Sequence, residues 1–205
     1  MDLSHLIAAI DDGVRAINQL KEPHSLKFIQ QAVAMITDCY RQGGKLLIAG
    51  NGGSLCDASH FAEEMTGIFR KLRPALPAIA FSEPGHLTCI GNDLGYDKVF
   101  SRAVEAYGKP EDIFIGLTTS GNSGNLIAAF EEAKKRGIKS IAFLGKTGGK
   151  CKGMADLELI ITGFSTSDRI QEAHMTAIHI IIEFVENALF TQEQQVVYQS
   201  AVAAQ

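Results

Sequence analysis

The sequence has no long hydrophobic run and no basic leader. None of its apolar runs approaches the roughly 20 residues that a membrane span requires. The N-terminus carries Asp2 and the pair Asp11-Asp12, where a secretory signal would have a basic region followed by an apolar core. We therefore expect a cytoplasmic protein with no membrane partner.

Closely spaced cysteines and an excess of positive charge are also absent. The four cysteines are far apart and form no Cys-x-x-Cys pair, so neither a disulfide framework nor a thiolate zinc site is expected. A net charge of -4 gives no electrostatic reason to expect nucleic acid as a partner. The sequence also lacks an internal repeat and any sign of a second domain, and its 205 residues suffice for one well-buried domain.

Five short apolar runs alternate with helical stretches. The runs are 45–49, 77–81, 112–117, 140–144 and 157–161. This alternation predicts an α/β fold, a three-layer sandwich in which a five-stranded parallel sheet has helices on both faces. In a flavodoxin-like strand order, 2-1-3-4-5, ligands bind where the order reverses, between the loops that follow the first and third strands. We assign residues 43–190 to this domain.

Residues 1–42 read as an N-terminal helical pair of the same domain, interrupted at Glu22-Pro23. The first predicted helix has an apolar stripe with near-heptad spacing, made of Leu3, Ile7, Ile10, Val14, Ile17 and Leu20. The stripe could pack on its own domain or on another subunit, and the second choice would give a symmetric oligomer. Residues 191–205 are glutamine-rich, without a clear period, and are interpreted as a C-terminal appendage.

A glycine-rich loop follows the first predicted strand. Asn51-Gly52-Gly53 permits a tight turn, and Ser54 is a natural N-cap for the helix predicted from there to about residue 69. The first turn of that helix would direct unpaired N–H groups and the positive end of the dipole at an anion. His60 and Glu64, four residues apart, share one face of the helix and are candidate metal ligands.

A hydroxyl-rich loop follows the third predicted strand. Thr118, Thr119, Ser120 and Ser123 supply four hydroxyls within six residues. Hydroxyls and backbone amides bind phosphate oxygens, but the Gly-Lys-Ser/Thr ending of a nucleoside triphosphatase loop is absent, so a sugar phosphate is the expected ligand. Either loop alone could be an ordinary strand-to-helix connection, whereas two of this composition favour a binding site.

The last predicted helix, residues 168–189, carries Gln171, His174 and His179. A histidine beside an apolar stripe is more often a core residue than a ligand. Gln171 and His179 are about 80° apart around the helix and ~12 Å apart along it, so both could reach one ion only near the limit of their length. His174 is a rival candidate, and spacing alone does not decide between the two histidines.

Taken together, these motifs closely resemble those of the phosphoheptose isomerases, members of the sugar isomerase (SIS) domain family. The resemblance rests on four segments of the sequence. They are residues 50–54 with Asp57 and residues 60–64, then Gly91-Asn92-Asp93, then residues 119–123, and finally residues 168–172 with His174 and His179. It implies conversion of sedoheptulose 7-phosphate to D-glycero-D-manno-heptose 7-phosphate, the first step of heptose supply for lipopolysaccharide through ADP-heptose, and a homotetramer. Thr118 stands where the family leads us to expect serine, which keeps the hydroxyl.

The resemblance also assigns roles to individual residues. It makes His60, Glu64, Gln171 and His179 ligands of one zinc ion. The substrate contacts that it implies are Asn51, Gly52, Gly53, Glu64, Asn92, Asp93, Thr118, Thr119, Ser120, Ser123 and Gln171, with Ser54 and Asp168 beside them. Our hypothesis is that Glu64 is the general base and His179 shuttles the second proton, while the ion polarises the carbonyl. Asp57 and Asp168 are candidates for supporting the ligands.

A non-catalytic alternative is an SIS-domain oligomeric binding protein, of the kind that associates with a bacterial replication initiator. Such a protein needs the fold but not the site. All four candidate ligands and both loops are present here, which favours the isomerase. A sugar-phosphate-sensing regulator would carry a DNA-binding module, and we find none in the sequence.

Overall fold

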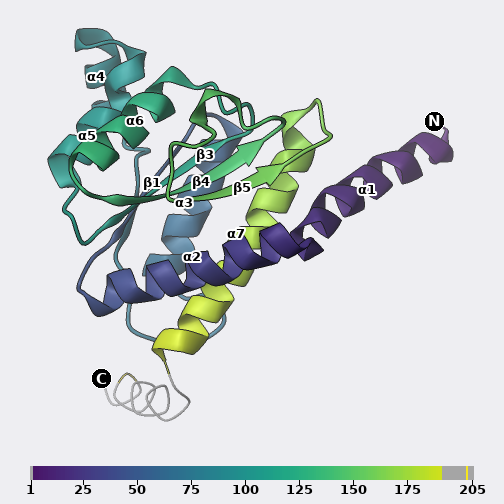
Figure 1. Ribbon diagram of the computed structural model, residues 1–205, viewed down its shortest axis with the longest axis horizontal. Coiled ribbons are helices and arrows are strands. Elements are labelled where there is room, and N and C mark those ends of the chain that lie inside the picture. The colour runs from purple at the N-terminus through teal and green to yellow at the C-terminus, as the bar shows by residue number, and fades with distance from the viewer. Residues whose placement is uncertain (1, 191–201, 203–205) are drawn as a thin grey trace.

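The computed structural model describes residues 2–190 and residue 202 (Figure 1). The strands are β1 (Leu46–Gly50), β2 (Ala78–Ala80), β3 (Ile113–Thr118), β4 (Lys139–Gly145) and β5 (Leu157–Ile161). The helices are α1 (Leu3–Asn18), α2 (Pro23–Arg41), α3 (Gly53–Thr66), α4 (Pro84–Asp93), α5 (Val99–Tyr107), α6 (Gly124–Lys135) and α7 (Ser167–Leu189). Apart from residue 202, the predicted appendage 191–205 lies outside the described residues.

The sheet is parallel and has the order β2-β1-β3-β4-β5, which confirms the predicted flavodoxin-like order. Strands β1 and β3 are neighbours, with Leu46 opposite Ile113 and Gly50 opposite Leu117. Their carboxyl ends therefore lie together at the point where the strand order reverses. The glycine-rich and hydroxyl-rich loops both begin there.

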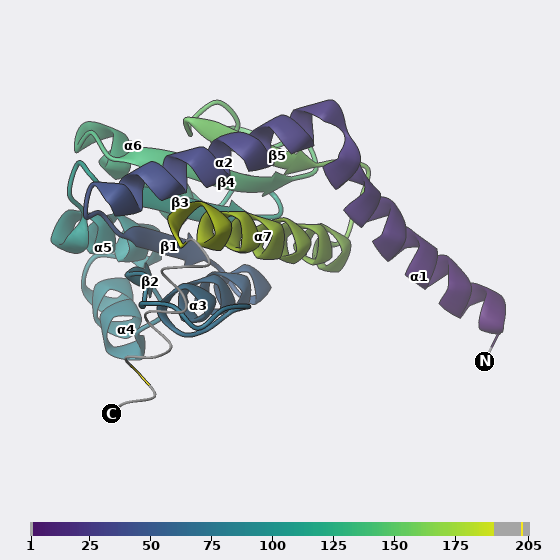
Figure 2. The same cartoon turned by 90° about the horizontal axis from the view of Figure 1, so that it is seen from below.

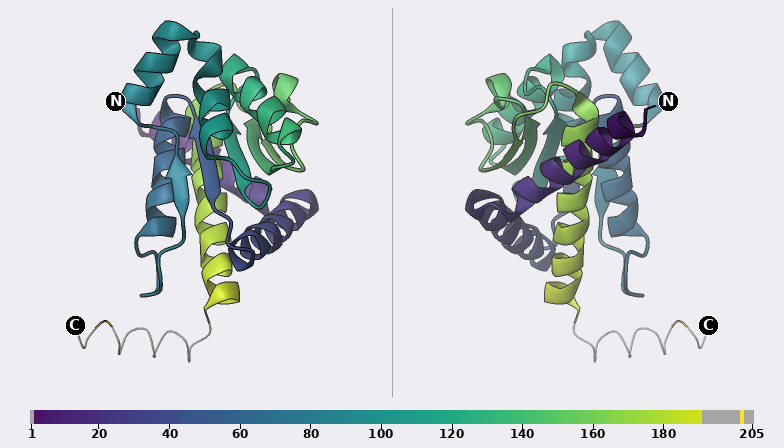
Figure 3. Two further views of the ribbon diagram at one scale, coloured as in Figure 1. Left: turned by 90° about the vertical axis from the view of Figure 1, so that its left-hand side faces the viewer. Right: turned by 90° about the vertical axis from the view of Figure 1, so that its right-hand side faces the viewer.

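Alternating residues of each strand pack into two separate cores. Leu46 and Ile48 of β1 join the core formed with α2, α3 and α7, whereas Leu47 and Ala49 join the core formed with α5 and α6. The period of two follows from the pleat of the strand. Helices thus cover both faces of the sheet, as predicted (Figures 2 and 3).

The two N-terminal helices are packed very differently. Pro23 starts α2, which lies against β5 and α7, whereas α1 projects beyond the body of the domain (Figure 1). Leu3 and Ile10 of α1 are 69% and 65% exposed, and the buried residues of that helix are the small Gly13 and Ala16. Most of the predicted apolar stripe of α1 therefore does not pack on its own domain. No helix within residues 2–190 is long and apolar enough to cross a membrane.

The start of α3 differs from the prediction. The helix begins at Gly53, and its N-cap is Gly52, which has φ 56° and caps without a side chain. The positive φ of Gly52 places the N-cap two residues before the predicted Ser54. Ser54 is buried inside the first turn, so its predicted role as N-cap is wrong.

A buried ion pair joins the end of α3 to α7. The Arg73 guanidinium is inaccessible to water and donates from Nε to Glu186 Oε1 at 2.8 Å. It also donates from Nη2 to the Glu64 carbonyl and from Nη1 to the Met65 carbonyl, each at 2.8 Å. One side chain therefore satisfies carbonyls at the end of α3 and fixes that end against α7.

Replacing Arg73 should destabilise the protein strongly. Removing one partner of a buried pair leaves an uncompensated charge, so Arg73→Met should lower the free energy of unfolding by about 3–5 kcal/mol in urea titrations. The matched control is Arg102→Met, which breaks an exposed pair with Glu105 and should cost under about 1 kcal/mol. Equal losses in the two variants would contradict this role for Arg73.

Candidate active site

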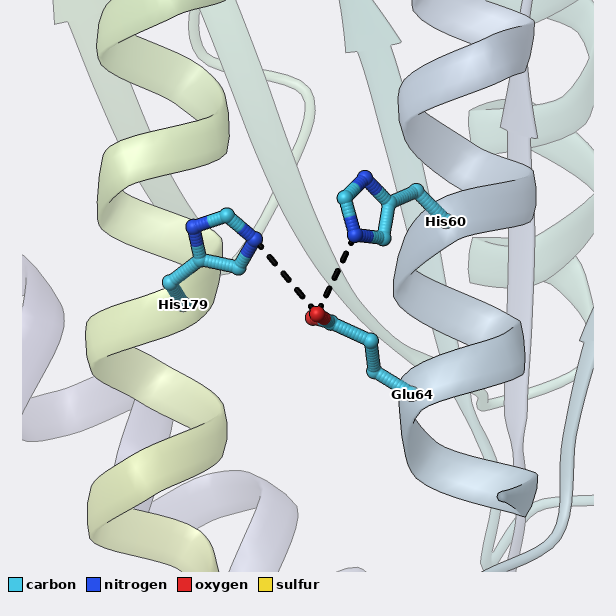
Figure 4. A group of neighbouring side chains, drawn as sticks. All are labelled: His60, Glu64 and His179. Carbon is cyan, nitrogen blue, oxygen red and sulfur yellow. Dashed lines mark hydrogen bonds and ion pairs between the residues drawn. The ribbon is translucent and has the colours of Figure 1, made fainter. Parts of the chain in front are cut away.

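Three side chains from α3 and α7 converge at one point (Figure 4). One ligand atom each from His60, Glu64 and His179 lies within 4.8 Å of the others. Glu64 Oε1 is 3.1 Å from His60 Nε2 and 3.6 Å from His179 Nε2. The structure thus brings His179 to the pair His60 and Glu64, although Glu64 and His179 are 115 residues apart along the chain.

The composition of this cluster suits a divalent cation. Two imidazole nitrogens and a carboxylate oxygen are ligands that zinc accepts. Glu64 Oε2 is buried and has no hydrogen-bond partner within the described residues. A buried carboxylate oxygen without a partner is costly, and a cation at the cluster would compensate its charge.

The structure distinguishes the two histidines of α7, between which helix spacing alone did not decide. His174 is fully buried, and its Nε2 is 2.9 Å from the Leu144 carbonyl oxygen. Burial lowers the pKa of His174 to about 4, so the ring is neutral at ordinary pH. His174 is therefore a core residue. His179 faces the cluster instead and stacks on Phe69, with ring centroids 5.8 Å apart.

Gln171 contacts the glycine-rich loop. Its Nε2 donates to Ser54 Oγ at 3.4 Å. A Cβ on Gly53 would lie 2.5 Å from the same nitrogen, so a larger residue there would displace the Gln171 amide from the loop. This contact puts Gln171 beside the predicted anion site, and its role as fourth metal ligand stays a prediction.

The side chain of Asn51 bridges the two loops. Asn51 Nδ2 donates to Asn125 Oδ1, and Asn125 Nδ2 donates to Asn51 Oδ1, both at 2.9 Å. The Tyr96 hydroxyl donates to the same oxygen of Asn51 at 3.1 Å. Neither Asn125 nor Tyr96 was predicted from the sequence. Asn125 could have been found as an amide in the first turn of the helix that follows the hydroxyl-rich loop.

The hydroxyl-rich loop is held by its own hydrogen bonds. Thr118 Oγ1 lies 3.2 Å from Ser123 Oγ and accepts from the Gly121 N–H at 3.1 Å. Gly121, with φ 66°, packs so closely that a Cβ would lie 1.8 Å from the Gly148 carbonyl oxygen. The Ser120 Oγ accepts from the Asn122 N–H, so its own O–H can still donate to a ligand. Contacts within the chain therefore fix the conformation of this loop.

Other predicted site residues lie around these loops. Thr119 Oγ1 is 2.9 Å from Ser167 Oγ at the start of α7. Asn92 and Asp93 are exposed at the end of α4, and Asn92 Nδ2 donates a hydrogen bond to Asp93 Oδ1 at 2.7 Å. Tyr96, three residues after Asp93, is the residue that contacts Asn51. Their role as substrate contacts stays a prediction.

The two aspartates predicted to support the ligands differ in environment. Asp57 is half-buried, and burial raises the pKa of its carboxyl to about 6, an effect that the charge of His60 partly offsets. Asp168 is exposed in the first turn of α7, where a hydrogen bond with Thr166 lowers the pKa of its carboxyl. Asp57 is therefore the aspartate that lies beside the cluster.

Comparison with known proteins shows the family of the chain. The model of the SIS domain family matches residues 10–145. A phosphoheptose isomerase of Vibrio cholerae is 53% identical over 170 residues, which cover 83% of this chain and 89% of that protein. A phosphoheptose isomerase of Yersinia pestis is 51% identical over 172 residues, which cover 84% of this chain and 89% of that protein.

Solved structures extend the likeness to three dimensions. The phosphoheptose isomerase of Neisseria gonorrhoeae superposes with a TM-score of 0.83 at 37% identity, covering 90% of this chain and 99% of that one. The phosphoheptose isomerase of Francisella tularensis superposes with a TM-score of 0.84 at 32% identity, covering 90% of this chain and 98% of that one. With sequence identity of this level over nearly the whole length of its relatives, the chain belongs to the phosphoheptose isomerase family, which is built on the SIS domain.

Proposed function

We propose that this protein is the isomerase that converts sedoheptulose 7-phosphate to D-glycero-D-manno-heptose 7-phosphate in the cytoplasm. The observation that carries the proposal is the cluster of His60, Glu64 and His179 on helices that begin beside the two loops. Aldose–ketose isomerisation needs a base, an acid and a group that stabilises the enediolate oxygen. The product would enter ADP-heptose synthesis for lipopolysaccharide.

The cluster would hold one divalent ion, with Gln171 as the fourth ligand. Neutral nitrogen and oxygen donors together with one carboxylate suit zinc. When bound, the ion would act as a Lewis acid that polarises the substrate carbonyl. Glu64 Oε2, buried and without a partner in the described residues, supports this assignment.

The chain's own groups would move the protons. Glu64 would abstract the proton next to the carbonyl, and His179 would return a proton to the neighbouring carbon. A carboxylate cannot be a tight ligand and a free base at once, so Glu64 or His179 must loosen from the ion during turnover. Phe69, stacked on His179, would keep the imidazole oriented when it does.

The loops would bind the remainder of the substrate. The Ser120 hydroxyl and the N-termini of α3 and α6 would receive the phosphate, because neutral donors and helix dipoles stabilise an anion there. The other proposed contacts are Asn51, Gly52, Gly53, Ser54, Asn92, Asp93, Thr118, Thr119, Ser123, Asp168 and Gln171.

The exposed apolar face of α1 supports a homo-oligomer, which we propose to be a tetramer. A groove of about 510 Å³ between α2 and α7 is continuous with that face through Ile17 and has Leu26 and Phe184 among its lining residues. Contiguous apolar surface of this kind marks an interaction site. A second copy of the same N-terminal helices has the complementary apolar face, and an isologous contact would cover both surfaces.

The first test combines metal analysis with an isomerase assay. The purified protein should contain stoichiometric metal and turn over sedoheptulose 7-phosphate. His60→Ala and His179→Ala should each lose the metal and the activity while remaining folded, because each removes a ligand from a different helix. His174→Ala is the matched control and should keep its metal, since that ring bonds a backbone carbonyl in the core. Full metal retention in His179→Ala would overturn the ligand assignment.

The second test concerns the phosphate. Removing one donor to a charged group costs about 1.5–3 kcal/mol, so Ser120→Ala should weaken apparent substrate affinity about ten- to a hundredfold. Saturation kinetics with sedoheptulose 7-phosphate measure the effect. Ser101→Ala on α5, whose hydroxyl bonds the Lys98 carbonyl, is the control and should leave the kinetics unchanged. An unchanged KM in Ser120→Ala would remove this hydroxyl from the site.

The third test concerns the base. Glu64→Gln keeps the size and a ligand oxygen but removes the basic lone pair. The variant should still bind substrate, but its kcat should fall by a factor of about 10²–10⁴, since that is the usual contribution of a general base. Exchange of the substrate C1 hydrogen with deuterated water reports the step directly, provided that metal content is measured in the same sample.

Glu63→Gln provides the control for Glu64→Gln. Glu63 is the adjacent carboxylate, exposed and 3.8 Å from His60, and its variant should exchange hydrogen at nearly the normal rate. Near-normal exchange in metal-loaded Glu64→Gln would move the base elsewhere, with His179 as the first candidate.

A further inference from the structure

The amide pair between Asn51 and Asn125 joins the start of the glycine-rich loop to the helix that follows the hydroxyl-rich loop. Asn51 follows β1 directly, and Asn125 lies in the first turn of α6, beyond the loop that follows β3. Both amide hydrogen bonds are 2.9 Å long. Asn125 is only 2% exposed, so its amide is shielded from water, whereas Asn51 is partly exposed.

Hydrogen-bond capacity limits what Asn51 can offer to a ligand. An amide oxygen accepts two hydrogen bonds, and Oδ1 of Asn51 already receives one from Asn125 and one from Tyr96. Its Nδ2 carries two hydrogens, and one of them goes to Asn125 Oδ1. A single N–H of this side chain remains for a ligand, and its direction is set by Asn125 and Tyr96.

The same pair fixes the spacing between two parts of the site. On one side, Asn51 begins the loop that leads into α3, the helix that carries His60 and Glu64. On the other side, Asn125 lies in the first turn of α6, directly after the hydroxyl-rich loop with Ser120 and Ser123. A substrate whose carbonyl lies at the cluster and whose phosphate lies in the hydroxyl-rich loop must span that distance.

We infer that Asn125 is a positioning residue of the isomerase site, which holds Asn51 and sets the distance between the catalytic cluster and the phosphate loop. Asn125 acts through Asn51 and does not itself touch the reacting atoms. Tyr96 assists by donating to Asn51 Oδ1, which selects one of the two orientations of the amide. The inference rests on the proposed function, because the distance matters only for a substrate that reaches both subsites.

Asn125→Leu tests this role, because leucine has nearly the same shape but offers no hydrogen bond. Each subsite should stay intact on its own, so metal affinity and competitive inhibition by inorganic phosphate should change by less than about twofold. The kcat/KM for sedoheptulose 7-phosphate should fall about ten- to a hundredfold, mainly through kcat, because a misplacement of ~1 Å can cost that much. A purely structural role would weaken metal affinity, phosphate inhibition and kcat/KM together.

Tyr96→Phe is the second variant, chosen because Tyr96 is 59% exposed and its replacement does not threaten folding. It removes one hydroxyl and should lower kcat about three- to tenfold, with metal and phosphate binding unchanged. Its effect should be much smaller in the Asn125→Leu background, because both residues act on the same amide. Tyr107→Phe on α5, also an exposed tyrosine, is the control and should show normal kinetics.

The outcomes separate the inference from the proposed function. Normal kcat/KM in Asn125→Leu, or in Tyr96→Phe should the first variant not fold, would overturn the inference alone. A parallel loss of metal, phosphate and substrate binding would also overturn it. Failure of the unsubstituted, metal-loaded protein to isomerise sedoheptulose 7-phosphate would overturn the proposed function and the inference with it.

Discussion

The buried guanidinium of Arg73 is the interaction on which the geometry of the site depends most. It donates to the carbonyl of Glu64 itself and to the carboxylate of Glu186 on α7, and neither ionic side chain is reached by water. Glu186 lies two turns beyond His179 on the same helix. The backbone of one candidate ligand and the helix of another are therefore tied to one planar group. Because the fork of an arginine has fixed geometry, the two helices have little freedom to slide.

The two halves of the site match the two ends of the proposed substrate. The cluster of two imidazoles and a carboxylate suits chemistry at a carbonyl, whereas the hydroxyl-rich loop suits a phosphate that takes no part in the reaction. In sedoheptulose 7-phosphate the carbonyl and the phosphate are at opposite ends of the carbon chain. Binding energy from the phosphate can then orient the reacting end only if the two halves keep a constant separation. The neighbouring parallel strands β1 and β3, together with the hydrogen bonds from Asn51 at the end of β1 to Asn125 in the first turn of α6, provide that constancy.

Local patterns predicted much of this structure, and long-range contacts account for what they missed. The alternation of strands and helices predicted the order of the sheet, and four-residue spacing predicted that His60 and Glu64 share a face. The choice between His174 and His179 depends on which side of α7 meets β4, and that is decided by packing from elsewhere in the chain. Arg73 and Glu186 are 113 residues apart, so no local pattern points to their pairing. The start of α3 was misplaced because Gly52 takes a positive φ, which allows the turn to close before Ser54.

The N-terminal helix connects the proposed oligomer to the site. Leu3, Ile7, Ile10 and Val14 are exposed on α1 in the single chain. Burying these apolar side chains against another subunit would stabilise the assembly. The same helix lies against α7, where a Cβ on Gly13 would come within 2.9 Å of Glu172 Oε2. Glu172 follows Gln171 and lies two turns before His179. Subunits that cover α1 would therefore also hold the segment of α7 that carries the proposed ligands, and assembly would make the site more rigid without adding a residue to it.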